Sequence, residues 1–396
     1  MLLLEREKFP RFHLGESLLP GSMPVLESLG VMPELRERFI LKHGARFHYD
    51  ASGAKERYVF ATAFDAKFDH AFQVPRDEFD DVLLKNAEKK GAEVRHEWDV
   101  KRIRFEGARA VGVDAVDPEG KPHAIDAAFV VDATGRDALL AGDRREKSKI
   151  DRLDKSAFYN HYRGTRRQAG IEEGDIDIVI FSGGWFWFIP FKDGRTSVGA
   201  VVSSAWVREA KEAGAHDADA LLDRAIAQSP AAQWLLRLDE GGAEKLWPKA
   251  RAAADYSYRV SHNFGDGYVM VGDSGGFVDP LFSSGAHIAI RGAARAAEVI
   301  DEALKDGDVS AKRFEAWAAE VKLGTDTFVD AVQAFYAGGL VRYLFAEKKH
   351  TFLRRSITSL LAGDVYSSDA RWIKDVRVRL ADMAKPNWNE KAVVGV

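Results

Sequence analysis

The most regular pattern of apolar and polar positions lies in residues 76–90. Phe79, Val82 and Leu83 recur at a spacing that places their side chains on one face of a helix. Acidic residues stand in the first turn and lysines in the last, as the helix dipole favours, and Gly91 follows as a typical end residue. The pattern predicts an amphipathic helix over residues 76–90.

Short, continuous apolar runs predict strands that are buried on both faces, as in a parallel sheet. Such runs occupy residues 2–4, 128–131 and 268–271. An acidic residue stands at or just beyond the end of each run: Glu5, Asp132 and Asp273. Together with the helix at 76–90, these runs predict an α/β body.

A different pattern follows in residues 176–202, which resembles antiparallel β-structure. Apolar stretches at 176–181 and 185–191 are followed by the turn signal Lys-Asp-Gly-Arg at 192–195 and by a return strand at 196–202. Residues 217–237 are expected to be helical and to lie outside this sheet. Residues 308–396 are predicted to be mainly amphipathic helix.

Composition narrows the possible classes of protein. The 396 residues include 57 Lys plus Arg and 61 Asp plus Glu, a net charge of −4, which argues against a nucleic-acid-binding surface. The absence of cysteine excludes disulfides, thiolate metal sites and a cysteine nucleophile, and no metal site is expected. No apolar run approaches the roughly 20 residues that span a bilayer, so we expect no membrane span and a cytoplasmic location.

One short motif suggests a hydrolase. Residues 272–276 match G-x-S-x-G between a predicted strand and a predicted helix, which is the setting of a serine nucleophile. Ser274 would then be that nucleophile. No H-G-G-G segment for an oxyanion hole is present, so a serine hydrolase at Ser274 is a distant alternative.

A longer segment, residues 272–287, favours a ligand site. A strand end delivers the carboxylate of Asp273, a glycine-rich loop follows, and a helix begins near residues 283–285. A carboxylate accepts hydrogen bonds from sugar-like hydroxyls, and free N–H groups at a helix start attract anions. The segment therefore suits a ligand that has a polyol and an electron-rich, partly anionic ring.

From residue 2 to about residue 370, the sequence resembles the flavin-dependent oxidoreductases and, within them, the flavin-dependent halogenases. The resemblance rests on residues 3–6, 10–11, 15–20, 75–80, 132–136 and 272–273. It implies that Glu5 binds the adenosine ribose, Arg76 lies against the cofactor and Asp273 holds the ribityl chain. The full set of residues implied to bind FAD is Glu5, Arg11, Glu16, Ser17, Arg76, Asp273, Pro280 and Gly285.

Residues 185–190 carry a narrower signature, because they match the W-x-W-x-I-P motif of flavin halogenases. On a strand, Trp185, Trp187 and Ile189 share one face. The resemblance implies that these residues, with Pro190 and Phe282, keep the substrate away from the flavin and so suppress direct hydroxylation.

Lys42 matches the position of the halogenase active-site lysine, and Ser283 matches the serine of the family's S-x-G loop. Burial would favour the neutral form of the Lys42 amine. Ser284 and Gly285 match the backbone amides near which halide is held. Phe282 replaces the glutamate of the tryptophan-directed enzymes, which points to phenol- and pyrrole-directed relatives.

The resemblance implies an FAD-binding Rossmann-like body with an inserted mixed β-sheet substrate region and a helical C-terminal lobe. Residues 1–150 and 260–307 would form the body, 151–259 the sheet with a helical insertion, and 308–396 the lobe. A strand–G-x-G-x-x-G–helix unit of roughly 30 residues is expected before such a body. The printed sequence contains no such motif, so the chain is expected to lack this unit, as a mis-started gene model, a partial sequence, a decayed homologue or a non-catalytic relative would.

The implied activity is FADH₂-dependent halogenation of an electron-rich aromatic ring such as a phenol or pyrrole. Chloride or bromide and O₂ would give hypohalous acid, which passes to Lys42. A flavin reductase would supply FADH₂, and the small aromatic substrate would be free or tethered to a carrier protein. The main alternative is an FAD-dependent monooxygenase or reductase of the same fold.

Overall fold

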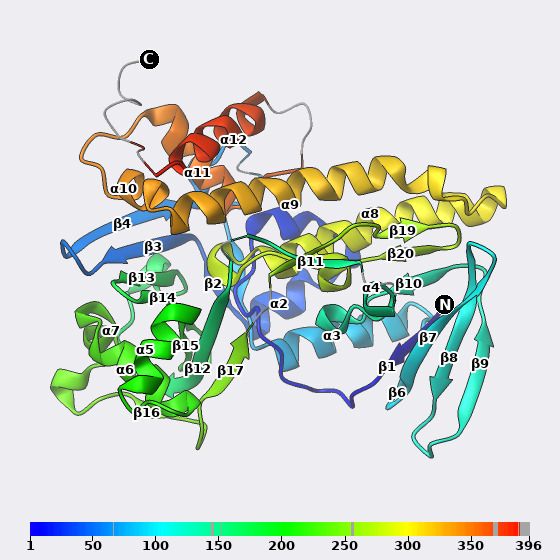
Figure 1. Ribbon diagram of the computed structural model, residues 1–396, viewed down its shortest axis with the longest axis horizontal. Helices are drawn as coiled ribbons and strands as arrows, with labels where there is room; N and C mark the ends of the chain where they lie inside the picture. The colour runs from blue at the N-terminus through cyan, green and yellow to red at the C-terminus, as the bar shows by residue number, and fades with distance from the viewer. Residues whose placement is uncertain are drawn as a thin grey trace.

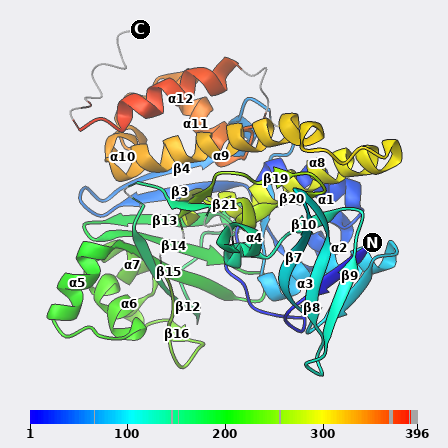
Figure 2. The same cartoon turned by 45° about the vertical axis from the view of Figure 1, so that its right-hand side comes forward.

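The computed structural model describes residues 1–65, 67–143, 146–151, 153–254, 257–366, 371–386 and 388. It confirms the mixed α/β class, with several sheets and a helical C-terminal region. Figures 1 and 2 show one large sheet beside a body of smaller sheets, with a long helix running above both.

The large sheet has the strand order β16-β12-β15-β14-β13-β3-β4, and β17 also pairs with β12. Neighbouring strands are antiparallel except β13 and β3, which are parallel. The predicted hairpin is confirmed as β14 and β15. Because β3 and β4 belong to this sheet, it extends beyond the 151–259 segment. The strands are β3 (Gly44–Tyr49), β4 (Ala54–Val59), β12 (Lys155–Arg163), β13 (Ile176–Phe181), β14 (Gly184–Pro190), β15 (Arg195–Ser203), β16 (Glu244–Lys245) and β17 (Arg251–Ala254).

The smaller sheets include the buried runs predicted from the sequence. β1 (Leu2–Glu5) is parallel to β6 (Glu93–His96), and β10 (Val130–Asp132) is parallel to β20 (Tyr268–Met270). Two of the predicted acidic residues therefore end strands of these parallel pairs: Glu5 ends β1 and Asp132 ends β10. The remaining strands are β2 (Ile40–Lys42), β5 (Ala71–Gln73), β7 (Asp99–Glu106), β8 (Arg109–Val116), β9 (Pro122–Asp126), β11 (Lys147–Lys149), β18 (Tyr258–Val260), β19 (Phe264–Gly265) and β21 (Gly276–Phe277).

The predicted helix at 76–90 is α3 (Arg76–Lys89), although its buried side chains are Phe79, Val82 and Leu84, while Leu83 is only partly buried. The predicted helix at 217–237 is divided because Pro230 begins a new helix, which the Ser229 side chain caps. No helix within the described ranges is long and apolar enough to cross a membrane. The other helices are α1 (Met23–Leu29), α2 (Met32–Arg38), α4 (Leu139–Asp143), α5 (Ser204–Glu212), α6 (Ala218–Ala227), α7 (Pro230–Leu235), α8 (Ser284–Asp306), α9 (Glu315–Tyr336), α10 (Gly339–Leu344), α11 (Thr351–Leu361) and α12 (Arg371–Met383).

The two faces of the large sheet are covered by different helices. Trp185 and Trp187 of β14 belong to a core that also includes side chains of α9, α11 and α12. Phe186 and Phe188, which alternate with them, pack against α5, α6 and α7 on the opposite face. The period-two pattern predicted for residues 185–190 is confirmed.

Gly199 of β15 makes room for the Trp187 indole. The two residues are paired across the strands, and a Cβ atom on Gly199 would lie 2.2 Å from the Trp187 ring. The Trp187 Nε1–H donates a hydrogen bond to Ser197 Oγ at 3.0 Å on the same strand. The orientation of the Trp187 indole therefore depends on the absence of a side chain at Gly199.

His287 of α8 joins three segments of the chain. Its Nδ1 is 2.8 Å from Ser22 Oγ, and its Nε2 is 2.8 Å from the carbonyl oxygen of Gly363. Since a carbonyl only accepts, Nε2 carries the proton and donates to Gly363, while the Ser22 hydroxyl donates to Nδ1. Burial lowers the pKa of His287 to about 3, so the neutral ring holds α8 to the segment after α11.

We expect Gly199→Ala to destabilise the fold by about 1–3 kcal/mol, because the added methyl group must displace the Trp187 ring. Urea unfolding and near-ultraviolet circular dichroism of the tryptophans measure the effect. Gly292→Ala in α8 is the control, since its Cβ atom would lie 3.6 Å from the nearest neighbouring atom. Equal stability of the two variants would contradict the packing described here.

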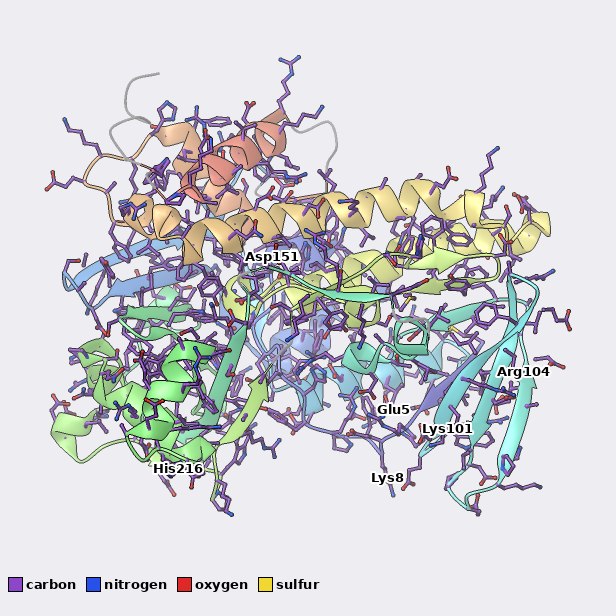
Figure 3. All side chains as sticks on the ribbon, viewed as in Figure 1. Glu5, Lys8, Lys101, Arg104, Asp151 and His216 are labelled. Atoms are coloured by element: carbon purple, nitrogen blue, oxygen red, sulfur yellow. The ribbon has the colours of Figure 1, made fainter. Side chains whose placement is uncertain are left out.

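The depressed pKa of His287 predicts a loss of stability in acid. The unfolded ring protonates near 6.5 and the folded ring near 3, so its contribution is complete above 6.5 and is lost as the pH falls through this window. We expect the unfolding free energy of the wild type to fall more steeply than that of His287→Gln, by about 1.4 kcal/mol per pH unit. His216, which Figure 3 places at the molecular edge, is exposed, and His216→Gln is the control for the loss of a histidine side chain.

Candidate active site

Lys42 ends β2 with its side chain buried, at 1% exposure. Its Nζ donates a hydrogen bond to the carbonyl oxygen of Leu18 at 3.0 Å and lies 5.3 Å from the centre of the Phe60 ring. Pairing of β2 with β5 sets Lys42 opposite Ala71. Sheet pairing thus holds a lysine in an apolar setting, close to the backbone of the 15–20 loop.

Burial lowers the pKa of Lys42 to about 7, while the negative charge of Asp175 acts in the opposite direction. Both the ammonium and the amine are therefore populated near neutral pH. The ammonium is a hydrogen-bond donor only, whereas the amine also offers a lone pair to an electrophile.

The 15–20 loop carries two polar side chains that are buried but incompletely satisfied. Glu16 Oε1 is 2.8 Å from His161 Nε2, whereas Glu16 Oε2 and Ser17 Oγ have no hydrogen-bond partner in the described part of the chain. Buried polar atoms are normally paired. The two unpaired oxygen atoms, Glu16 Oε2 and Ser17 Oγ, therefore favour a ligand that forms hydrogen bonds with them.

Asp273 and the start of α8 lie together. A Cβ atom on Gly285 would be 3.9 Å from Asp273 Oδ1 and 3.1 Å from the Phe277 ring. Burial raises the pKa of Asp273 to about 6, against the opposing charges of Arg76 and Arg136. No donor among the described residues bonds to this carboxylate, so it is available to hydroxyl groups of a ligand.

The turn before α8 aims backbone amides outward from the helix. Ser283 adopts the left-handed conformation, with φ of 55°, and directly precedes Ser284 and Gly285 in the first turn. The N–H groups of a first turn have no partner within the helix, and the helix dipole favours an anion there. This arrangement suits a halide, as the sequence predicts.

The tryptophan wall, defined as Trp185, Trp187 and Ile189, is buried together with Phe282. Pro190, which was predicted to belong to it, alternates with these residues along β14 and lies beside Phe188 on the opposite face. Trp185 Nε1–H donates to the Tyr336 hydroxyl at 3.0 Å, and that hydroxyl donates to Asp279 Oδ2 at 3.0 Å. The same carboxylate accepts the Leu281 N–H through Oδ1, also at 3.0 Å. The wall and the turn that leads to α8 are therefore joined by one hydrogen-bond chain.

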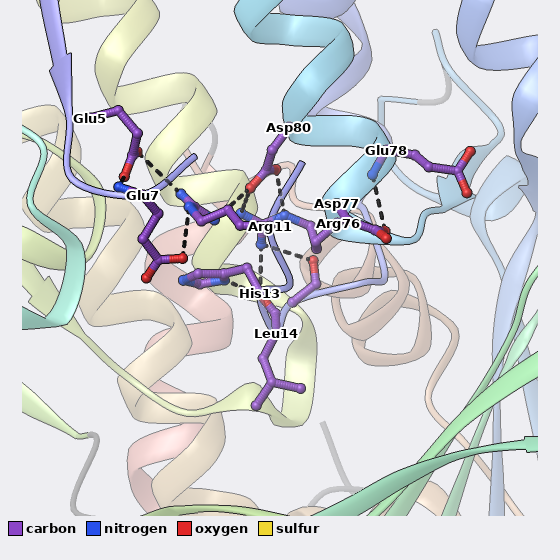
Figure 4. Close-up of polar contacts among 10 residues, drawn as sticks. Glu5, Glu7, Arg11, His13, Leu14, Arg76, Asp77, Glu78 and Asp80 are labelled. Atoms are coloured by element: carbon purple, nitrogen blue, oxygen red, sulfur yellow. Dashed lines mark hydrogen bonds and ion pairs between the residues drawn. The ribbon is translucent and has the colours of Figure 1, made fainter. Parts of the chain in front are cut away.

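Figure 4 shows how the predicted basic residues are held. Arg76 forms a two-point contact with Asp80, Nε–Oδ1 at 2.7 Å and Nη2–Oδ2 at 3.1 Å, and donates through Nη1 to the carbonyl oxygen of Leu14 at 2.7 Å. Arg11 lies 3.3 Å from Asp80 and 3.7 Å from the Glu5 carboxylate. Glu5, Arg11 and Arg76 thus share one network around the segment that leads into the 15–20 loop.

The geometry of Ser274 is incompatible with a nucleophile. Its side chain is fully buried, and its hydroxyl donates to the carbonyl oxygens of Asp132 at 2.6 Å and Val271 at 2.9 Å. No histidine in the described part of the chain bonds to it. The G-x-S-x-G match lies in a short 3-10 turn between β20 and β21 and not at the start of a helix, so the predicted strand-to-helix setting is absent and the geometry gives the serine-hydrolase alternative no support.

Four buried or partly buried polar residues near these sites were missed by the sequence prediction: His161, Asp175, Asp279 and Tyr336. Asp279 lies within the 272–287 segment and is followed by proline, so its capping role was available as a signal. His161 and Tyr336 become significant only through contacts with residues far away in the sequence.

Comparison with known proteins identifies the family. The sequence model of the family described as tryptophan halogenase matches residues 49–339. The chain belongs to the flavin-dependent halogenase family.

Two curated relatives of the halogenase chain illustrate the similarity. A tryptophan 2-halogenase of Chondromyces crocatus is 33% identical over 74% of this chain, and the match spans 55% of that protein, little more than half its length. A 1H-pyrrole-2-carbonyl-[peptidyl-carrier protein] chlorinase of Pseudomonas fluorescens is 28% identical, over 92% of this chain and 84% of that protein.

Solved structures match nearly the whole halogenase chain. A flavoprotein/dehydrogenase from Cytophaga hutchinsonii has a TM-score of 0.87 at 28% identity and covers 97% of this chain and 91% of its own. The myxobacterial chondrochloren halogenase CndH, described as a variant of FAD-dependent halogenases, has a TM-score of 0.77 at 31% identity and covers 96% and 91%.

Halogenases of this family use FAD, and the residues of this chain fit that cofactor. Asp273 offers a free carboxylate beside the start of α8, where Gly285 leaves space that a Cβ atom would fill. Glu16 and Ser17 present buried polar atoms that lack a partner among the described residues. Gly15, whose Cβ atom would lie 2.9 Å from Arg76 Nη1, permits close approach of the loop to that side chain.

Proposed function

We propose that this protein halogenates an electron-rich aromatic ring, such as a phenol or pyrrole, with chloride or bromide, O₂ and reduced FAD. The observation that carries the proposal is the buried Lys42, whose pKa of about 7 makes its amine available at neutral pH. A surface lysine would be almost entirely ammonium under these conditions.

Reduced FAD, when bound, would supply two electrons to O₂ and the halide would supply two more, which gives hypohalous acid and water. In our proposal the Asp273 carboxylate accepts hydrogen bonds from the ribityl hydroxyls, and Glu16 and Ser17 contact the ring system. Glu5, Arg11 and Arg76 line the approach to these residues, and Pro280 and Gly285 shape the loop at the helix start.

The halide is placed at the amides of Ser284 and Gly285. These groups begin α8 and therefore combine free N–H donors with the positive end of the helix dipole. Ser283 directs the turn through its left-handed backbone conformation.

Lys42 acts on the hypohalous acid. The ammonium form donates a hydrogen bond to its oxygen, and the amine form attacks the halogen to give an N–halogen bond with release of water. Electrophilic transfer then joins the halogen to a ring carbon, which loses its proton. Burial supports this role because it keeps the amine away from competing water.

The tryptophan wall gives the reaction its selectivity for halide over oxygen transfer. Direct hydroxylation requires the substrate beside the flavin, and the bulky face of Trp185, Trp187 and Ile189 with Phe282 obstructs that approach. Phe282 stands where the tryptophan-directed enzymes carry a glutamate, so this position offers no carboxylate to a ring cation, which favours electron-rich rings. The pyrrole chlorinase similarity supports a substrate tethered to a carrier protein, and a flavin reductase would supply FADH₂.

A flavin monooxygenase or reductase is the second candidate function, because the flavoprotein/dehydrogenase of Cytophaga hutchinsonii has the same fold. The two functions differ in their dependence on halide. A product hydroxylated in the absence of halide would overturn the halogenase proposal, whereas a halogenated product that requires chloride or bromide would support it.

We expect Lys42→Ala to reduce halogenated product by at least about 100-fold while O₂ consumption by reduced flavin continues, because the electrophile loses its acceptor. Mass spectrometry of the product and an oxygen electrode measure the two quantities. Lys101→Ala is the control, since Figure 3 places Lys101 among the strands on the far side of the molecule from the large sheet. Normal halogenation by Lys42→Ala would refute the role of Lys42.

We expect Asp273→Asn to weaken FAD binding by roughly 10-fold or more, because an amide loses the charge that strengthens hydrogen bonds from hydroxyls. Quenching of flavin fluorescence measures the affinity. Asp126→Asn is a matched control, because the Asp126 side chain is 91% exposed on β9. Unchanged affinity in Asp273→Asn would remove this residue from the FAD site.

A further inference from the structure

The strand that carries Lys42 rests on the loop before β13. A Cβ atom on Gly174 would lie 1.9 Å from the carbonyl oxygen of Leu41, so only glycine permits this backbone contact. Gln73 of β5 donates through Nε2 to the Gly174 carbonyl oxygen at 2.8 Å. The loop therefore touches both strands of the β2–β5 pair.

Asp175, the next residue, is buried against the backbone that follows Lys42. Its side chain has 0% exposure, and Oδ1 accepts the backbone N–H of His43 at 3.1 Å. Oδ2 accepts Arg57 Nε at 2.7 Å and would lie 3.2 Å from a Cβ atom on Gly44. A charged carboxylate thus lies directly beside the segment that holds the lysine.

Other charged groups surround this pair from each neighbouring element. Arg57 of β4 also lies 3.5 Å from Glu172, which is paired with Arg46. Asp177 on β13 is occupied by Arg46 at 3.2 Å and His48 at 2.7 Å. On the other side, Asp69 and His70 lie near the His43 ring, and Glu16 of the 15–20 loop is bonded to His161.

We propose that Asp175 is a positioning residue for Lys42: its carboxylate fixes the backbone at His43 and supplies the negative charge that balances the buried ammonium. The importance of Asp175 for catalysis rests on the function proposed above. The Asp175 carboxylate is bonded to the His43 N–H and to Arg57 and not to Lys42 Nζ, so it acts through position and charge.

The effect of Asp175 on the pKa of Lys42 supports this assignment. Burial disfavours the ammonium of Lys42, and Asp175 is the charge that opposes this effect and holds its pKa near 7. Arg57 partly neutralises the same carboxylate, because the two are paired at 2.7 Å. We therefore expect loss of Asp175 to lower the pKa of Lys42 and loss of Arg57 to raise it.

This sign reversal gives the test. In protein labelled with ¹³C at lysine, nuclear magnetic resonance follows the titration of Lys42, which Lys42→Arg assigns by removing its signal. We expect Asp175→Asn to lower the titration midpoint by about one pH unit and Arg57→Gln to raise it. Asp177→Asn removes a carboxylate two residues away that does not contact His43, and it should move the midpoint much less.

A structural role alone would not give shifts of opposite sign, so unchanged or same-signed midpoints in folded variants would overturn the proposal. Urea unfolding checks that each variant is folded, and Arg57→Gln carries the test if Asp175→Asn does not fold. The pH profile of halogenation should shift with the midpoint. If Lys42→Ala halogenates normally while the midpoints still shift as expected, the proposed function fails and the positioning role of Asp175 is retained.

Discussion

The cost of burying the lysine amine is the constraint on which the site depends. An ammonium removed from water is strongly disfavoured unless other charges and dipoles replace the lost hydration. Here the Leu18 carbonyl oxygen, the Phe60 ring and the charge of Asp175 provide that replacement. They come from three separate segments of the chain, so the site exists only when those segments are packed together.

The packing that brings them together is shared with the tryptophan wall. Trp185, Trp187, Phe60 and Phe282 belong to one hydrophobic core, which extends into the C-terminal helices. Tyr336, at the end of α9, bonds both to the wall and to Asp279 at the turn before α8. The C-terminal helices thus support both the large sheet and the loop that is proposed to hold the halide.

The contacts of Arg76 show that one side chain can have two roles. In the structure the guanidinium of Arg76, which the family resemblance implies to lie against the cofactor, is bonded to Asp80 and to the carbonyl oxygen of Leu14. An arginine held in this way positions the 15–20 loop and also contributes charge to its surroundings. Such double use is common for arginine, because its planar group offers several donors in fixed directions.

The sequence by itself determined the elements and the kinds of residue that carry the chemistry. Alternation at 185–190 placed Trp185 and Trp187 on one face, short apolar runs placed Asp132 and Asp273 near strand ends, and the resemblance to flavin-dependent halogenases singled out Lys42. These are properties of neighbouring residues, so periodicity and motif spacing reveal them. Only the tertiary structure decided that Asp175 lies beside the Lys42 segment, that His161 meets Glu16, and that Ser274 is bonded to backbone carbonyls. Those contacts join residues 132, 145 and 142 positions apart, and the charge and burial that they create depend on how the sheets and helices pack rather than on local sequence.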